Sequence, residues 1–247
     1  MDKPYLSVIV PAYNEEKRIG RTLDAIGEYL KKRDFSSEVL VVSGGSTDRT
    51  VEVAEGKGSV IPNLSVIAQT RAQNRGKGDA VKTGMLRAKG EIRLFTDADN
   101  STDIAHFDKM RPLFDTGCAV VIGSRHSWDA EGARQAISQP WHKRILGMAG
   151  NLFIQVVAVW GIWDTQCGFK AFRDTAAEKI FSRQRIPGWG FDVEALALAR
   201  KFDYRIGIIP VYWINDPMSH VRFSTYFRVL WETAMVRLNL IMRRYAA

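Results

Sequence analysis

The sequence predicts an α/β protein whose single, mostly parallel sheet is covered by helices on both faces. Strand-like runs of apolar and β-branched residues alternate with helical patterns four times within the first hundred residues. A chain of 247 residues with 46% hydrophobic residues is long enough for one large core. Its 25% content of charged residues is ordinary for a soluble protein, so one α/β domain with a C-terminal extension is expected.

Each element of the first half has its own signal. Apolar runs closed by turn residues predict strands, and apolar residues spaced by three or four positions predict helices. The expected strands cover 5–10, closed by Pro11, and then 38–42, 64–68 and a central run at 94–96. The expected helices begin at 14–16, near Arg49 after a turn at 43–48, and at 79. Farther on, 120–125 and 206–212 predict strands, and 195–200 predicts a helix.

Charge and cysteine content limit the partners and the compartment. The net charge of +8 indicates an anionic partner, which could be nucleic acid, a phosphorylated substrate or an acidic membrane surface. Cys118 and Cys167 lie far apart without the spacing of zinc ligands, so neither a disulfide framework nor a structural zinc is indicated. Residues 1–4 lead directly into a strand and leave no room for a cleavable signal, so we expect a cytosolic setting.

Asp97 and Asp99 directly follow the central strand. Open α/β sheets bind ligands at the carboxyl ends of their strands, and paired carboxylates there suit Mg²⁺ or Mn²⁺ with a substrate diphosphate as a further ligand. A plain turn after the strand is the alternative, because Asp and Asn are common in turns. The loop at 74–78 adds Lys77 between two glycines, which suits a phosphate, although an exposed basic turn would give the same pattern.

A series of motifs resembles family 2 glycosyltransferases of the GT-A fold, in their polyprenyl-phosphate hexosyltransferase branch. The motifs occupy 7–16, 74–78, 97–99, 123–125, 164–170 and 191–194, and the resemblance extends from about residue 5 to residue 222. It implies a catalytic domain at 1–222 and transfer of a hexose, with glucose favoured, from a nucleotide-diphosphate sugar to a polyprenyl (dolichyl-type) phosphate with inversion. UDP-glucose is the favoured donor, GDP-mannose is an alternative, and no nucleic-acid partner is expected.

The resemblance also implies roles for individual residues. The expected catalytic residues are Asp99, Arg125 and Asp192, and Asp97 and Asp99 are the expected metal ligands. The expected donor-binding residues are Pro11, Tyr13, Glu15, Ser43, Lys77, Asp97, Ala98, Gln166 and Trp189. The acceptor phosphate is expected at Arg125, Lys170 and His220.

One position departs from the family pattern. Gly44 stands where the family usually has an acidic residue that contacts the nucleotide base. Either the nucleotide binds less tightly or another group contacts the base. Gly44 leaves open a homologue that binds nucleotides but has lost catalysis. A second alternative of the same fold is a transferase acting on a hydroxyl, with Asp192 as general base.

Two apolar stretches concern the membrane. Residues 145–163 carry no charge, but three glycines favour a helix that is interfacial or buried over one that spans the bilayer. Residues 223–247 combine an apolar and aromatic stripe with arginines, which is typical of an interfacial anchor. Docking of this helix on the core, or dimerisation, is the alternative. We expect the anchor, and a peripheral position on the cytoplasmic face of a membrane.

Overall fold

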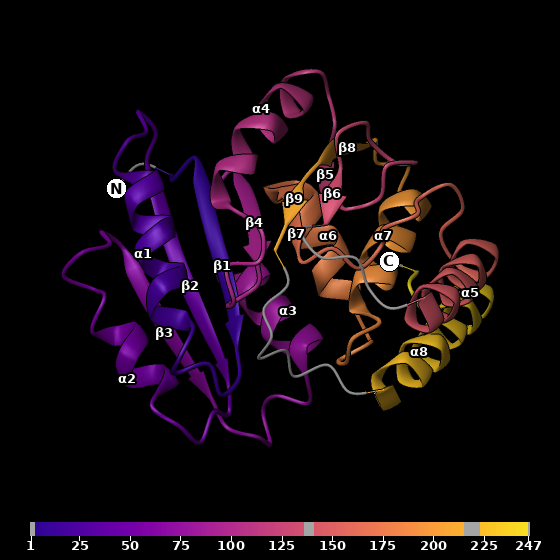
Figure 1. The fold of residues 1–247 in the computed structure, drawn as a ribbon, viewed down its shortest axis with the longest axis horizontal. Coiled ribbons are helices and arrows are strands. Elements are labelled where there is room, and N and C mark those ends of the chain that lie inside the picture. The colour runs from indigo at the N-terminus through magenta and orange to yellow at the C-terminus, as the bar shows by residue number, and fades with distance from the viewer. Residues whose placement is uncertain (1–2, 136–140, 215–222, 247) are drawn as a thin grey trace.

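The computed structural model describes residues 3–135, 141–214 and 223–246 (Figure 1). The strands are β1 (Leu6–Ala12), β2 (Ser37–Gly44), β3 (Leu64–Gln69), β4 (Ile92–Thr96), β5 (Val120–Ser124), β6 (Arg134–Gln135), β7 (Phe169–Arg173), β8 (Ile206–Pro210) and β9 (Tyr212–Trp213). The helices are α1 (Ile19–Leu30), α2 (Thr50–Glu55), α3 (Lys77–Arg87), a 3-10 turn (Ile104–His106), α4 (Phe107–Asp115), α5 (Trp141–Val157), α6 (Asp174–Arg183), α7 (Phe191–Lys201) and α8 (Phe223–Ile241).

The main sheet has seven strands in the order β3-β2-β1-β4-β7-β5-β8. Strand β7 is antiparallel to both of its neighbours, and the other pairings in this sheet are parallel. The predicted α/β class with a mostly parallel sheet is therefore confirmed. The parallel order brings the carboxyl ends of β1, β2 and β4 to one edge, where loops from distant parts of the chain meet.

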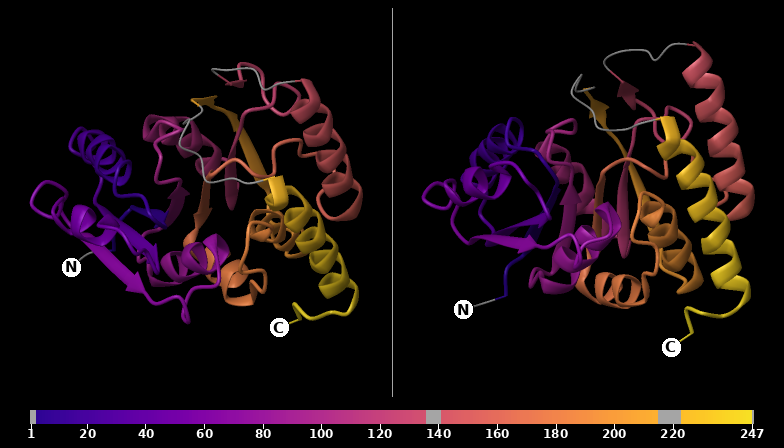
Figure 2. Two further views of the ribbon diagram at one scale, coloured as in Figure 1. Left: turned by 60° about the horizontal axis from the view of Figure 1, so that its bottom comes forward. Right: turned by 90° about the horizontal axis from the view of Figure 1, so that it is seen from below.

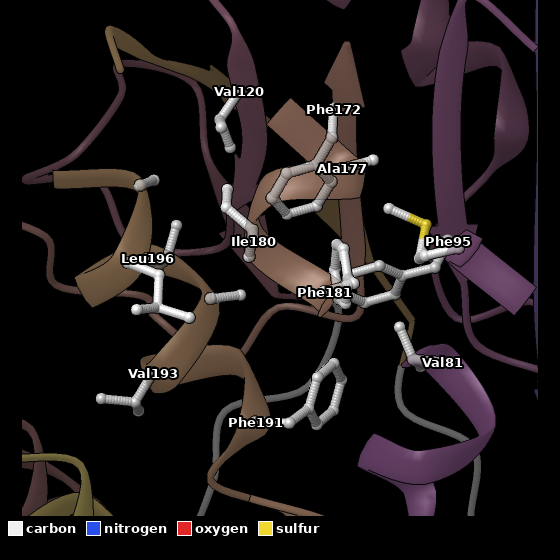
Figure 3. Packing of buried hydrophobic residues seen from close by; sticks show 14 of the residues in the cluster. Val81, Phe95, Val120, Phe172, Ala177, Ile180, Phe181, Phe191, Val193 and Leu196 are labelled. Carbon is white, nitrogen blue, oxygen red and sulfur yellow. The ribbon is translucent and has the colours of Figure 1, made fainter. Parts of the chain in front are cut away.

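Helices cover both faces of the sheet, because alternate residues of each buried strand point to opposite sides. In β1, Ile9 packs toward α3 and α7, whereas Val8 and Val10 pack toward α1. Figure 3 shows the first of these cores, where Phe95 of β4, Phe172 of β7 and the helical side chains around them interdigitate. This packing fixes the strands whose ends carry the site.

The first strand ends later than predicted, and the first helix begins later. Strand β1 runs through Pro11 to Ala12, because its register with β2 continues to that point. Helix α1 begins at Ile19 and not at 14–16, since Asn14 takes a positive φ of 55° that is incompatible with helix. The carbonyl of Glu15 instead accepts the first helical bond, from the N–H of Ile19.

Helices α5 and α8 lie side by side at the outer edge of the molecule and form the outer helix pair (Figure 2). The uncharged stretch at 145–163 falls partly in α5, which ends at Val157 before the chain turns back. Within the described ranges, no helix is both long and apolar enough to cross a membrane.

Helix α8 has two different faces. Val229, Val236 and the following Tyr245 are buried in the core beside α7. Its opposite face leaves large apolar side chains exposed, among them Trp231 at 68%. One side of the helix therefore docks on the core, as the alternative to the anchor interpretation states. The other side exposes apolar side chains to solvent.

Candidate functional site

The end of β4 and the start of α3 bring opposite charges together. The ammonium of Lys77, the first residue of α3, lies 2.5 Å from Oδ1 of Asp97, the residue after β4. Burial alone would lower the pKa of Lys77, but the negative charges of Asp97, Asp192 and Asp99 together outweigh it, and the pKa is raised. Lys77 is therefore a fixed positive charge at the strand edge, next to the two predicted metal ligands.

Asp99 stands at the same edge. Its Oδ1 accepts a hydrogen bond from the N–H of Ser101 at 2.9 Å, and its Oδ2 lies 4.0 Å from Nη1 of Arg18. Burial and the neighbouring charge of Asp97 raise the pKa of Asp99. Two carboxylates that repel each other and remain partly exposed are an arrangement that a divalent cation would stabilise. Among the described residues no cluster of three acidic, histidine or cysteine side chains surrounds a possible ion.

The glycines beside Lys77 serve packing within the chain. A Cβ at Gly76 would lie 2.7 Å from the carbonyl oxygen of Pro187, and one at Gly78 would lie 2.7 Å from that of Ile186. The two glycines therefore let the segment before α7 lie directly on the first turn of α3.

Trp189 belongs to that segment and is half-buried. Its ring centroid lies 5.3 Å from Nζ of Lys77, within the range of a cation–π contact. The structure places this glycine-flanked tryptophan, an expected donor-binding residue, against the basic residue of the candidate site.

Asp192 and Lys170 form a buried ion pair behind this edge, with Nζ and Oδ1 2.5 Å apart. Burial raises the pKa of Asp192, and the ammonium of Lys170 opposes that rise. Lys170 also donates to the carbonyl oxygen of Cys167 and has no exposed surface. An acceptor phosphate cannot reach Lys170 here, which departs from the expectation that it binds one. Asp192 is 4% exposed and packs under the site.

Arg125, directly after β5, is held by Asp164. Its Nε and Nη2 donate to the two carboxylate oxygens at 2.7 and 2.8 Å. Burial alone would raise the pKa of the Asp164 carboxyl, but the guanidinium and backbone N–H of Arg125, together with the charge of Lys170, outweigh it and hold that pKa below its usual range. Arg125 also lies over Trp213, with its guanidinium carbon 5.3 Å from the ring centroid. The pair fixes the guanidinium in one orientation.

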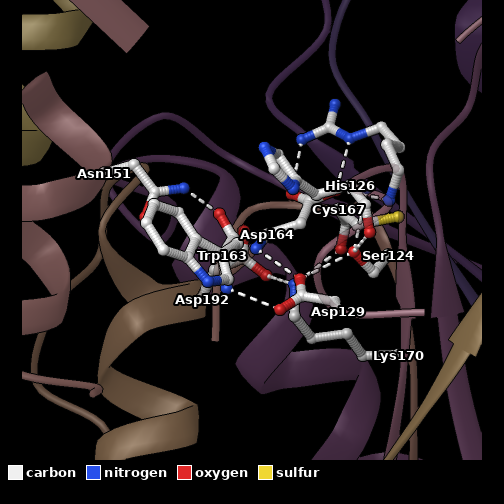
Figure 4. A network of polar contacts seen from close by, with 10 residues as sticks. Ser124, His126, Asp129, Asn151, Trp163, Asp164, Cys167, Lys170 and Asp192 are labelled. Carbon is white, nitrogen blue, oxygen red and sulfur yellow. Dashed lines mark hydrogen bonds and ion pairs between the residues drawn. The ribbon is translucent and has the colours of Figure 1, made fainter. Parts of the chain in front are cut away.

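A polar network supports this pair (Figure 4). Asp129 accepts from the hydroxyl of Ser124 and from the backbone N–H groups of Trp163 and Asp164. The side-chain amide of Asn151, on α5, donates to the carbonyl oxygen of Trp163. Sequence reasoning did not assign Asp129 or Asn151 to the site. Two partners of Asp129 lie 34 and 35 positions away, and no local pattern links Asn151 on α5 to Trp163.

The predicted nucleotide side lies at the ends of β1 and β2. Tyr13 is 44% exposed, and its hydroxyl accepts from Arg71, whose guanidinium carbon lies 5.6 Å from the ring centroid. Ser43 is buried, and its hydroxyl donates a hydrogen bond to the hydroxyl oxygen of Ser46. A Cβ at Gly44 would lie 3.1 Å from Nδ2 of Asn74, so the amide of Asn74 fills the place of a side chain there.

The remaining predicted residues are spread around this edge. Pro11 and Ala98 are buried, and the carbonyl oxygen of Ala98 accepts from the Thr22 hydroxyl. Glu15 forms a two-bond ion pair with Arg18, which turns it toward α1. Gln166 is half-buried. His220 lies outside the described residues.

Comparison with known proteins adds independent findings. The model of the family described as glycosyl transferase family 2 matches residues 7–181. The human dolichyl-phosphate beta-glucosyltransferase is 38% identical over 249 residues, covering 96% of this chain and 76% of the relative. The Dictyostelium discoideum enzyme of the same name is 36% identical over 253 residues, covering 98% and 76%.

Among solved structures, glucosyl-3-phosphoglycerate synthase from Mycobacterium tuberculosis, crystallised with Mn²⁺, UDP and its glucosylated product, has a TM-score of 0.68 at 20% identity. The match covers 96% of this chain and 79% of that one. At this identity the likeness concerns the fold, and it confirms the fold that the motif resemblance implied.

Proposed function

The chain belongs to glycosyl transferase family 2, and we propose that it transfers glucose from UDP-glucose to a dolichyl-type polyprenyl phosphate. The observation that carries this proposal is the cluster of Lys77, Asp97 and Asp99 at the carboxyl edge of the sheet. A diphosphate needs both a fixed cation and hard oxygen ligands for a metal, and this edge offers both. Relatives named for dolichyl-phosphate glucosylation support the choice of glucose and of the lipid.

The donor would lie across the ends of β1, β2 and β4. Tyr13 offers an exposed ring for the nucleotide base, and Arg71 holds its hydroxyl. The amide of Asn74 fills the space next to Gly44 that the acidic side chain of the family pattern would otherwise occupy. Trp189, over Lys77, is placed to face the sugar and diphosphate end of the donor.

The donor set at Asp97 and Asp99 fits Mg²⁺ or Mn²⁺, since both ligands are carboxylates at one strand end. When bound, such an ion would neutralise charge on the departing diphosphate. Binding of the donor would let Lys77 exchange its carboxylate partner for a phosphate oxygen, and would free Asp97 to bind the cation. The fold neighbour crystallised with Mn²⁺ and UDP supports this assignment.

The acceptor phosphate would approach from the side of Arg125. Its guanidinium is oriented by Asp164, so little rotamer entropy is lost when the remaining donors meet a phosphate oxygen. The phosphate oxygen is already an anion, so the reaction needs positioning and charge neutralisation more than a strong base. The acceptor phosphate oxygen forms a bond to the anomeric carbon of the sugar as the bond between that carbon and the donor diphosphate breaks. This displacement inverts the anomeric carbon.

The outer helix pair is the proposed membrane contact. Its exposed apolar side chains are Met148, Leu152, Phe153 and Val156 on α5, and Phe227, Trp231, Leu238 and Ile241 on α8. Exposed arginines accompany them at 237, 243 and 244, a composition that suits an anionic lipid surface. A lipid acceptor would reach the site from this side, at the cytoplasmic face.

The function is tested with purified protein and a panel of nucleotide sugars. Incubation with dolichyl phosphate in liposomes should yield glucosyl phospholipid from UDP-glucose, identified by mass spectrometry. Product from GDP-mannose in place of UDP-glucose would assign mannosyl transfer. Glycosylation of a hydroxyl acceptor without any lipid product would move the general-base role to Asp192, and tight UDP binding without turnover with any acceptor would indicate a catalytically impaired homologue.

The membrane contact has a separate test. Trp231→Ser and Val156→Ser should each weaken binding to anionic liposomes about tenfold, because one large apolar contact with lipid is lost. Val60→Ser removes an exposed apolar side chain elsewhere and should bind as the wild type does. Undiminished binding by both outer-face variants would exclude the outer helix pair as the contact.

A further inference from the structure

We propose that Glu232 of α8 is a positioning residue for the donor site. The inference rests on the proposed function, because it assigns Glu232 the task of holding the segment 187–190, the Trp189 loop, against α3. Glu232 is the only acidic residue after Asp216 in the sequence. It lies on the buried side of α8 with 7% of its surface exposed.

The carboxylate of Glu232 binds the start of α7. The N–H of Gly190, the residue that precedes α7, donates to Oε2 at 2.6 Å, and Arg228 donates to Oε1 at 2.8 Å. A negative charge at a helix N-terminus is favoured by the unpaired N–H groups there. Glu232 thus connects the outer helix pair to the residue next to Trp189.

The glycines around Trp189 leave room for this carboxylate. A Cβ at Gly188 would overlap Oε1 of Glu232, and a Cβ at Gly190 would lie 2.7 Å from the Cβ of Glu232. The Gly-Trp-Gly sequence therefore lets α8 approach the Trp189 loop closely from behind.

The other side of the loop rests on the phosphate-binding end of α3. The carbonyl oxygen of Pro187 accepts a hydrogen bond from the N–H of Asp79 at 3.2 Å, and it lies close to Gly76. Trp189 covers Lys77. The loop is thus held between Glu232 and the residues proposed to bind the diphosphate, and loss of the carboxylate would leave the buried N–H of Gly190 without this acceptor.

The experiment compares Glu232→Ala and Glu232→Gln with Glu28→Ala and Glu28→Gln in the full chain. The Glu28 side chain is 63% exposed on α1 and serves as the matched control. UDP-glucose KM and kcat are measured at a temperature where circular dichroism shows every variant folded. Glu232→Ala should raise KM about tenfold, as expected when one charge-assisted contact no longer orders the site. Glu232→Gln should stay within about threefold of wild type, because its amide oxygen can still accept from Gly190.

Hydrogen exchange of the ligand-free protein provides a second readout. Peptides that cover the Trp189 loop should exchange faster in Glu232→Ala than in wild type, and no faster in the Glu28 variants. Unchanged KM and unchanged exchange in folded Glu232→Ala would overturn the proposal, as would a Gln variant as impaired as the Ala variant. If Glu232→Ala does not fold, Gly188→Ala disturbs the same contact from the loop side and should raise KM likewise, and an unchanged KM there would refute the inference. A wild-type protein that fails to bind UDP-glucose would refute the proposed function instead, while the exchange comparison still tests the contact.

Discussion

Lys77 and Asp97, which are twenty positions apart in the sequence, form an ion pair of 2.5 Å at the edge of the sheet. Both are proposed to serve the donor, one toward phosphate and the other toward a cation. In the ligand-free protein each satisfies the other, so neither charge is left unpaired in a partly buried place. The pair holds both groups at the position proposed for the diphosphate, where binding of the donor would separate them.

Replacement of Lys77 by Ala should weaken UDP-glucose binding about 10- to 150-fold. One charge-assisted contact to phosphate is worth roughly 1.5–3 kcal/mol, which corresponds to that range. Calorimetric titration with the donor measures the change. Lys89→Ala, which removes an exposed ammonium, is the control. Equal donor affinity in Lys77→Ala and wild type would show that Lys77 does not bind the phosphate and that 74–78 is an ordinary basic turn.

Replacement of Asp99 by Asn should reduce turnover by at least about a hundredfold without unfolding the protein. The loss corresponds to several kcal/mol of charge stabilisation at the diphosphate. The Asn oxygen can keep the hydrogen bond from the N–H of Ser101, so the melting temperature should hardly change. Excess EDTA should abolish wild-type turnover, and Mg²⁺ or Mn²⁺ should restore it.

Asp115→Asn removes an exposed carboxylate at the end of α4 and is the control for this charge change. Full activity in EDTA, or an Asp99→Asn variant as active as Asp115→Asn, would remove the metal from the mechanism.

Replacement of Asp164 by Asn should destabilise the protein by roughly 2–5 kcal/mol at pH 7, because it leaves the guanidinium of Arg125 without its charged partner. The folded-state pKa of Asp164 is lowered, so its contribution is complete above the unfolded-state value of about 3.9 and is lost as pH falls through the folded-state pKa. Urea unfolding should therefore show the gap between wild type and variant narrowing below about pH 4. A gap that stays constant to lower pH would argue against an ion pair.

Deletion of residues 223–247 should unfold or aggregate the protein, and should not leave an intact catalytic domain. Val229, Val236 and Tyr245 each bury a large side chain in the main core, and together they contribute about 5–9 kcal/mol, which is comparable to the whole stability of many domains. Thermal unfolding followed by circular dichroism tests this. A deletion variant that melts like the full chain would show that α8 is separable, as a pure anchor would be.

Local patterns in the sequence predicted β1 to β5, β8 and the helices α1, α2, α3 and α7, and the position of Asp97 and Asp99 at a strand end, but they did not predict β7, α4 or α6. The patterns could make these predictions because burial imposes periods of two and of 3.6 residues on nearby positions, and because parallel strands place their carboxyl ends at one edge. The motif series likewise determined the family, since each motif is continuous in the chain.

Only the tertiary structure decided which charges meet. In the structure Lys170 forms a buried ion pair with Asp192, and Arg125 forms one with Asp164. Glu232 of the last helix accepts a hydrogen bond from the N–H of Gly190 in the Trp189 loop. Each of these contacts joins residues that no local pattern connects, because strand order and helix docking select the partners. The same reason explains α8, whose sequence shows an apolar stripe but not which part of it packs on the core and which part stays exposed.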